Sequence, residues 1–204
     1  MTERLTIASL SMSKHVAWHK RALFVGCCVP LASLIYNALI GGLGPNPIEA
    51  TTRFLGDWAL SFLLITLTVT PLRLITRFAY VARFRRMLGL FAFFYVFLHM
   101  MSYAGLDQFF NWPEIWRDII KRKYITFGFI AFVTLSFLAA TSTDTMVRRL
   151  GSRRWRRLHS FVYPAGIIAV VHFFYMTKAD YTQPTLYASF LAIILGYRLY
   201  RRHS

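Results

Sequence analysis

The chain has 204 residues, of which 56% are hydrophobic, yet 24 lysines and arginines stand against 8 aspartates and glutamates, for a net charge of +16. This composition excludes a disordered chain, which requires low hydrophobicity. It also argues against a soluble nucleic-acid-binding protein, because such a protein spreads basic residues over a folded surface, whereas here they form short clusters between long apolar runs. The sequence therefore predicts an all-α membrane protein.

Six segments reach or approach the roughly 17–25 mostly apolar residues that a membrane-spanning helix requires. In chain order they are residues 22–40, 55–72, 88–106, 124–140, 161–177 and 185–199. The second carries Asp57 near its start, and the sixth is short. The expected architecture is a six-transmembrane-helix bundle over residues 22–199, with polar tails at residues 1–21 and 200–204.

The distribution of charge predicts the orientation of the bundle. Eighteen of the 24 basic residues lie on the N-terminal tail, the second and fourth connections and the C-terminus, whereas six lie on the other three connections. Six of the eight acids accompany the smaller group, so the two sides carry net charges of +16 and 0. By the positive-inside rule, both termini are expected in the cytoplasm. The orientation in the membrane therefore accounts for the basic clusters without a nucleic-acid ligand. The same clusters are expected to bind anionic lipids.

Two histidines lie deep inside predicted spans, where an ionisable side chain is a functional hypothesis by default. His99 and His172 each lie 11 residues into spans that run outward, which is about 16 Å at 1.5 Å per residue. The two side chains are therefore expected at one level in the outer half of the bilayer. His15, His19 and His203 lie in the polar tails, and we assign them no specific role.

Three interpretations compete for the pair formed by His99 and His172. The rings could simply make interhelical hydrogen bonds. Zinc would need more nitrogen, sulfur or oxygen ligands than this level offers. A bis-histidine haem needs only two imidazoles on facing helices and an apolar slot, and aromatic residues flank both positions, at 91–97 and 173–175. The matched depth favours the haem.

A third histidine, His159, lies at the cytoplasmic edge, 13 residues before His172. A second haem there would need a partner on the third span, but Arg85 and Arg86 occupy that region and cannot bind iron. Three roles stay open for His159. It could bind iron with another partner, contact a haem propionate or flavin phosphate, or cap the span.

Several short motifs together resemble a known family. They are Gly44-Pro45-Asn46-Pro47-Ile48-Glu49, Gly56-Asp57-Trp58-Ala59-Leu60, Thr70-Pro71-Leu72-Arg73, Arg85-Arg86-Met87-Leu88-Gly89-Leu90, Lys121-Arg122-Lys123-Tyr124-Ile125-Thr126, Thr141-Ser142-Thr143 and Trp155-Arg156-Arg157-Leu158-His159. This set closely resembles the haem-binding membrane subunits of bacterial periplasmic methionine-sulfoxide reductase systems, within the ferric-reductase-like transmembrane family. The match runs over residues 44–180, and Lys123 departs from it where the family has proline.

The resemblance implies a b-type haem and an FMN, with His99, His159 and His172 at the positions of the family's haem-associated histidines. It implies an electron-transfer subunit rather than a catalytic one, in the bacterial inner membrane, with residues 22–199 as the family's transmembrane domain. The donor would be a cytoplasmic flavin reductase or membrane quinol. The acceptor would be a periplasmic molybdopterin-containing reductase that repairs oxidised methionine in envelope proteins. No residue is assigned to FMN, although the arginines at 148–157 and Trp155 offer cationic and stacking partners.

Two other functions compete with electron transfer. One is a transporter whose intramembrane histidines relay protons, although the internal repeats common in transporters are missing from the sequence. The other is a non-catalytic anchor for a periplasmic partner.

The loop at residues 107–123 is the predicted docking surface for the periplasmic reductase. It is long enough for a short amphipathic helix and carries Trp112, Trp116 and the basic run Lys121, Arg122 and Lys123. The tryptophans could equally anchor the loop at the membrane interface.

Overall fold

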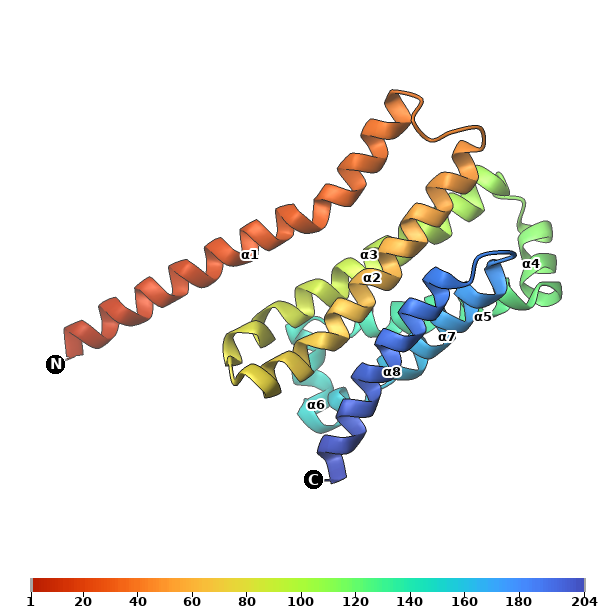
Figure 1. Ribbon diagram of the computed structural model, residues 1–204. Coiled ribbons are helices and arrows are strands. Elements are labelled where there is room, and N and C mark those ends of the chain that lie inside the picture. Colours follow the sequence, from red (N-terminus) through yellow and green to blue (C-terminus); the bar gives the residue numbers. More distant parts are fainter. Residues whose placement is uncertain (1, 204) are drawn as a thin grey trace. The chain divides into compact units, whose positions relative to one another are not determined.

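The computed structural model describes residues 2–203, with side chains described for residues 16–201. The side chains of His15 and His203 therefore lie outside the described residues. The chain forms two compact units, Met1–Gly44 and Pro45–Ser204 (Figure 1). Helices make up most of each unit.

The first unit is built around one long helix, α1 (Thr2–Leu39), with Pro30 inside it. Its polar side chains bond their own backbone. Ser33 Oγ donates to the carbonyl of Pro30 at 2.7 Å, and Asn37 Nδ2 donates to the carbonyl of Ser33 at 2.8 Å. Such local bonds satisfy polar groups where lipid offers no partner.

The second unit contains the remaining elements. In order they are α2 (Pro47–Thr76), the 3₁₀ segment η1 (Ala79–Phe84), α3 (Arg85–Met101), the π-helical segment η2 (Ser102–Asp107), α4 (Trp112–Lys121), α5 (Lys123–Ala140), α6 (Asp144–His159), α7 (Val162–Met176) and α8 (Thr182–His203).

Among the described residues, five helical stretches are long and apolar enough to cross a membrane. They are Val16–Leu39, Pro47–Thr76, Ala79–Asp107, Lys123–Ala140 and Asp144–Met176. The predicted all-helical membrane fold is confirmed, and the first five predicted segments overlap these stretches. The sixth lies inside α8, which is not among the five because polar residues begin this helix and arginines interrupt its end. The six-span count therefore stays a prediction.

Helix α2 begins eight residues before the predicted span, so that Thr52 is part of the helix. Asn46 caps the helix, its side chain accepting a hydrogen bond from the Glu49 amide at 3.4 Å, and Pro47 occupies the first turn. Both are favourable at a helix start, since the cap satisfies an otherwise unpaired amide and proline lacks one. The first turns of the helix therefore carry polar residues, which precede its apolar stretch.

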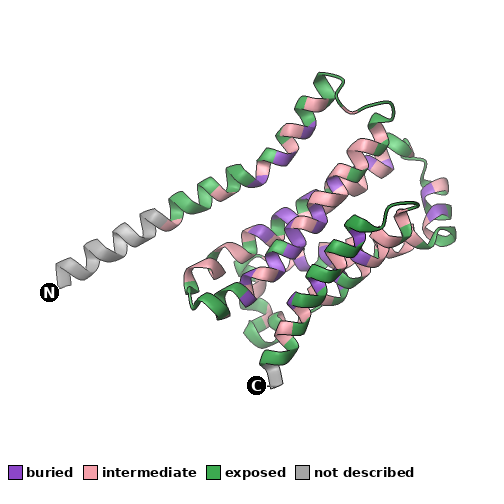
Figure 2. Cartoon of the chain, viewed as in Figure 1, coloured by how far each residue is buried: buried purple, intermediate pink, exposed green. Residues whose placement is uncertain are grey.

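Two helix pairs form the core of the second unit. α2 packs against α3 and α5 packs against α7, while α2 also contacts α7 and α8. Phe62 on α2 stacks on Tyr95 of α3, with ring centroids 5.1 Å apart, and Tyr95 is 0% exposed. Figure 2 shows buried positions running along α2 and exposed positions along α8. Large apolar side chains remain exposed on several helices, as expected where helices face lipid, among them Ile65, Leu72, Phe94, Phe97, Ile130, Phe137 and Ile193.

Arg198, inside the predicted sixth segment, ties α8 to the bundle. Its guanidinium donates to the carbonyl of Leu67 on α2 at 2.6 Å and to the hydroxyl of Tyr163 on α7. It also lies over the Tyr163 ring, 4.9 Å from the centroid. A carbonyl, a hydroxyl and an aromatic face thus stabilise a cation that would otherwise be costly in this position.

The arginine-rich segments of the second unit gather at one end. Arg86 at the start of α3 forms an ion pair with Asp144 at the start of α6, at 2.5 Å. The C-terminal end of α8 lies at this end, whereas α4 lies at the other (Figure 1). This arrangement is the one that the predicted orientation requires. Which end faces the cytoplasm stays a prediction.

Candidate functional site

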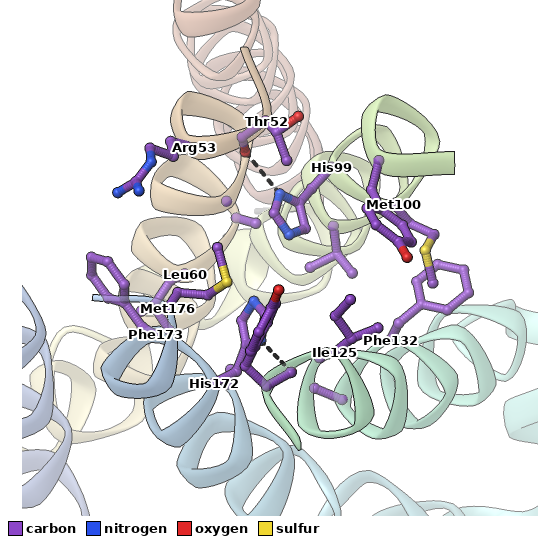
Figure 3. A pocket seen from close by; sticks show the side chains of 18 of the residues that line it. Thr52, Arg53, Leu60, His99, Met100, Ile125, Phe132, His172, Phe173 and Met176 are labelled. Atoms are coloured by element: carbon purple, nitrogen blue, oxygen red, sulfur yellow. Dashed lines mark hydrogen bonds between the residues drawn. The ribbon is translucent and has the colours of Figure 1, made fainter. Parts of the chain in front are cut away.

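His99 on α3 and His172 on α7 meet in the second unit. Their ring centroids are 6.1 Å apart and their planes are inclined by 77°. Figure 3 shows the two side chains reaching into one cavity from opposite sides. The two rings therefore meet, as their matched positions in the two spans predict, and their depth in the bilayer stays a prediction.

Each imidazole bonds a backbone carbonyl of the neighbouring helix in its own pair. Nδ1 of His99 lies 2.8 Å from the carbonyl oxygen of Thr52 on α2, and Nδ1 of His172 lies 2.7 Å from that of Tyr124 on α5. Because a carbonyl oxygen only accepts, Nδ1 of each ring donates, and Nε2 keeps its lone pair. This is the tautomer that a metal-binding histidine needs. The interhelical bonds therefore use Nδ1 and leave Nε2 of each ring available to a metal ion.

A glycine makes room for each ring. Gly56 on α2 and Gly128 on α5 each stand four residues, about one helical turn, after the carbonyl that the imidazole contacts. A Cβ at Gly56 would lie 3.1 Å from Cε1 and Nδ1 of His99, and one at Gly128 would lie 3.0 Å from the same atoms of His172. Non-bonded carbon atoms prefer about 3.5–4.0 Å. The same notch, a carbonyl and then a glycine one turn later, thus recurs on both helices.

The two histidines line a cavity of about 550 Å³ between the helix pairs. Its apolar lining includes Leu60, Leu63, Val96, Met100, Ile125, Phe129, Phe132, Leu135 and Met176. Its charged lining residues are Glu49, Arg53, Asp57, Asp107, Arg122 and Lys178. The cavity therefore combines an apolar interior with charged groups contributed mainly by helix ends and connections.

The residues present fit a haem better than a zinc ion. Among the residues that the structure describes, no three histidine, cysteine, aspartate or glutamate side chains come together, whereas structural zinc sites use four ligands. Haem iron can be held by two imidazoles, provided that an apolar space takes the macrocycle. Nε2 of His99, Nε2 of His172 and the cavity supply these requirements.

His159 lies elsewhere, at the end of α6. Its ring stacks on that of Trp155, with centroids 3.9 Å apart, and its Nε2 lies 3.2 Å from Thr141 Oγ1. Trp155 Nε1 donates to the Thr141 carbonyl at 2.9 Å. The structure thus brings His99 together with His172, and His159 does not line their cavity. One face of Trp155, considered above as a flavin-stacking residue, is covered by His159.

The predicted amphipathic helix in the loop at 107–123 is confirmed as α4. Trp112 and Trp116 are 65% and 61% exposed, while Ile115 and Asp118 are buried. The exposed tryptophans are compatible with both roles considered for this loop, partner docking and interfacial anchoring.

Arg122 does not belong with Lys121 and Lys123 as a free surface charge. Its guanidinium pairs with the buried carboxylate of Asp118 at 3.0 Å and donates to the Tyr124 hydroxyl at 3.2 Å. Because Arg122 also lines the histidine cavity, reversing its charge would disturb the site itself. The exposed lysines Lys121 and Lys123 remain as the cations of the predicted docking surface.

Sequence reasoning missed four residues that build the site, namely Thr52, Gly56, Tyr124 and Gly128. The sequence does contain a signal, since Gly56 follows Thr52 by four residues and Gly128 follows Tyr124 by four residues. This spacing does not identify the site by itself, because which helices pack against the histidine-bearing helices is known only from the structure. Thr52 also lies outside the predicted second span.

Comparison with known proteins finds one family and several similar chains. The family model of the ferric reductase like transmembrane component matches residues 55–170. A protein-methionine-sulfoxide reductase heme-binding subunit MsrQ from Rhodospirillum rubrum is 53% identical over 178 residues, 87% of this chain and 86% of the relative. Proteins of the same name from Polaromonas naphthalenivorans and Caulobacter vibrioides are 47% and 44% identical, over 89% and 85% of this chain and 84% and 83% of their own lengths.

Proposed function

The chain belongs to the MsrQ family of ferric reductase-like transmembrane proteins, and on that premise we propose that it is the haem-binding membrane subunit of a methionine-sulfoxide reductase system. Nε2 of His99 and Nε2 of His172 would hold the iron of one b-type haem. One observation carries the proposal. Both imidazoles commit Nδ1 to a backbone carbonyl and leave Nε2 beside one apolar cavity.

The chain's own residues prepare the site for electron transfer. The carbonyls of Thr52 and Tyr124 fix the orientation of the two rings. Their hydrogen bonds also make Nε2 of each ring more basic and therefore a stronger ligand for a metal ion. Apolar side chains such as Leu63 and Phe129 keep water away and keep the local dielectric low. Haem, when bound, supplies an iron that accepts and releases single electrons.

We place the haem on the periplasmic side, within reach of an acceptor. The cavity extends to Asn46, Asp107 and Lys178, which lie in or next to connections at the end opposite the arginine-rich one. The positive-inside rule puts the arginine-rich end in the cytoplasm. The full proposal is therefore six spans in the bacterial inner membrane, with both termini cytoplasmic and the cavity near the outer face.

The proposed electron path runs from the cytoplasmic side to the periplasm. A cytoplasmic flavin reductase or membrane quinol supplies electrons, and a periplasmic molybdopterin-containing reductase uses them to repair oxidised methionine in envelope proteins. The family resemblance supports these partners, and the predicted orientation supports the direction. The exposed surface formed by α4, Lys121 and Lys123 is the proposed docking site for the reductase.

For His159 we propose a role on the donor side, in electron delivery or in contact with an FMN phosphate, apart from the haem held by His99 and His172. Its stack on Trp155, within the arginine-rich helix α6, supports this role. FMN itself rests on the family resemblance alone.

The hydrogen bonds favour electron transfer over a proton relay. An imidazole in a relay must exchange the proton between its two nitrogen atoms. In His99 and His172 the Nδ1 proton is held by a carbonyl, and each ring would have to break that bond to relay a proton. A non-catalytic anchor would need neither the two matched tautomers nor the cavity.

The test is reoxidation of the reduced chain by its partner. The purified chain is reduced, mixed with the periplasmic catalytic subunit and methionine sulfoxide, and followed by stopped-flow absorption of the haem band. We expect rapid reoxidation that requires both additions. A haem band that stays reduced would contradict the proposed function.

A double variant tests the docking surface in the same assay. Lys121→Glu with Lys123→Glu leaves Arg122 and its ion pair in place, so the haem spectrum should stay intact. Reoxidation should slow and its dependence on salt should change, because rim charges act mainly on association. Reoxidation at the wild-type rate would move the docking site to another outer connection, such as residues 41–53.

A further inference from the structure

A second, smaller cavity of about 300 Å³ borders the histidine cavity near the α7–α8 connection. It is lined by Arg53, Phe173, Thr177, Lys178, Ala179, Asp180, Gln183 and Pro184. Arg53, Phe173 and Lys178 line both cavities, and Figure 3 shows Arg53 and Phe173 together on one side of the histidine pair. A largely apolar cavity and a more polar one thus meet at these three side chains.

Lys178 brings an uncompensated positive charge to this border. Among the described residues, no hydrogen bond or ion pair involves its ammonium group. The nearby carboxylate of Asp180 accepts a hydrogen bond from the Thr182 amide at 2.9 Å. Arg53 is paired with Glu49, its Nε and Nη2 lying 2.8 and 2.7 Å from Oε1, which leaves Nη1 as a further donor.

A third cation, Arg122, also lines the histidine cavity, and its charge is already neutralised by an acidic partner. Arg122 forms an ion pair with the buried carboxylate of Asp118 at 3.0 Å. A carboxylate placed beside Arg122 would therefore compete with Asp118, and one placed beside Lys178 would not. An ionised carboxylate moved into an apolar space without a partner is strongly unfavourable. The border at Lys178 is thus the better place for an anionic group.

We propose that Lys178, with Nη1 of Arg53, binds the propionate carboxylates of the haem, so that the polar edge of the macrocycle faces the α7–α8 connection. This inference rests on the proposed function, since it presupposes a haem between His99 and His172. Charge-assisted bonds from ammonium and guanidinium groups are among the stronger hydrogen bonds in proteins. The polar cavity also lets the carboxylates keep part of their hydration.

The rate of haem loss tests the proposal on the holoprotein. Transfer of haem from the full chain in detergent to excess apomyoglobin is followed by absorption. Lys178→Met should lose haem about tenfold faster, as expected for one lost charge-assisted hydrogen bond, and Lys178→Arg should restore most of the retention. Lys121→Met is the matched control, since it removes the same charge from the same end but lines neither cavity.

Haem dimethyl ester, whose carboxylates carry no charge, identifies the group that Lys178 binds. When the full chain carries this ester, Lys178→Met and the wild type should lose it at the same rate. The proposal is overturned if Lys178→Met retains ordinary haem like the wild type, or if its defect persists with the ester. If the wild-type chain binds no haem, or if its haem does not require His99, the proposed function itself is refuted.

Discussion

Replacing Gly56 or Gly128 by alanine closes the space against which a histidine ring lies. The added Cβ would stand 3.1 Å from His99 or 3.0 Å from His172, whereas an unstrained contact needs about 3.5 Å. The ring must therefore retreat by about 0.5 Å, which stretches the Nδ1 bond from 2.8 or 2.7 Å to the edge of the usual range of about 2.7–3.2 Å.

The expected cost falls on haem binding and not on the helix. Disturbing a hydrogen bond behind a metal ligand typically lowers metal affinity about 10–100-fold, so we expect haem affinity to fall at least tenfold in Gly56→Ala and in Gly128→Ala. Alanine in a helix interior is about 1 kcal/mol more favourable than glycine. The haem-free chain should therefore be as stable as the wild type or slightly more stable.

Two glycines on the histidine-bearing helices are matched controls. A Cβ at Gly89 on α3 would lie 3.5 Å from Thr66 Cγ2, and one at Gly166 on α7 would lie 3.6 Å from Leu67 Cδ1, both ordinary contacts. The assay is haem content per chain after purification, together with the rate of haem loss. If Gly56→Ala and Gly128→Ala hold haem as tightly as Gly89→Ala and Gly166→Ala, the role assigned to the two glycines is wrong.

Three further perturbations address other parts of the structure. Tyr163→Phe keeps the ring under Arg198 but removes the hydroxyl that accepts from it, so the free energy of unfolding should fall by about 1–3 kcal/mol; the same change in an Arg198→Met background should have little effect, as measured by denaturation in detergent. His159→Ala should leave the haem spectrum intact and slow reduction by the donor, whereas loss of the low-spin haem would make His159 a ligand. Reporter fusions within residues 108–121 should behave as periplasmic, and fusions within residues 144–159 and at the C-terminus as cytoplasmic; a periplasmic C-terminus would leave α8 outside the set of spans.

The meeting of the two histidines was predictable because a membrane-spanning helix has a fixed rise and a fixed direction. Counting 11 residues from the start of two outward spans puts His99 and His172 at one level without knowledge of the packing. The existence of α4 was predictable, but the side that it buries was not. Helical periodicity puts the apolar side chains of Trp112, Ile115 and Trp116 on one face, whereas the structure buries Ile115 with the acidic Asp118 and exposes both tryptophans.

The groups behind the histidines were not predictable, because they depend on which helices pair and on their rotation. Thr52 acts through its backbone carbonyl, and every residue has one, so its side chain gives no signal. Its position also depends on the cap at Asn46, because this cap lets α2 begin before the apolar stretch. Arg198 shows the same limit, since its partners Leu67 and Tyr163 are 131 and 35 residues away in the chain.

The most direct measurement is the absorption and electron paramagnetic resonance spectrum of the purified full chain, oxidised and reduced, beside those of His99→Ala and His172→Ala. A haem held by both imidazoles gives the wild type a six-coordinate, low-spin b-type spectrum, and each substitution should abolish it while the chain remains inserted in the membrane. If both variants keep the wild-type low-spin spectrum, His99 and His172 are not the axial ligands.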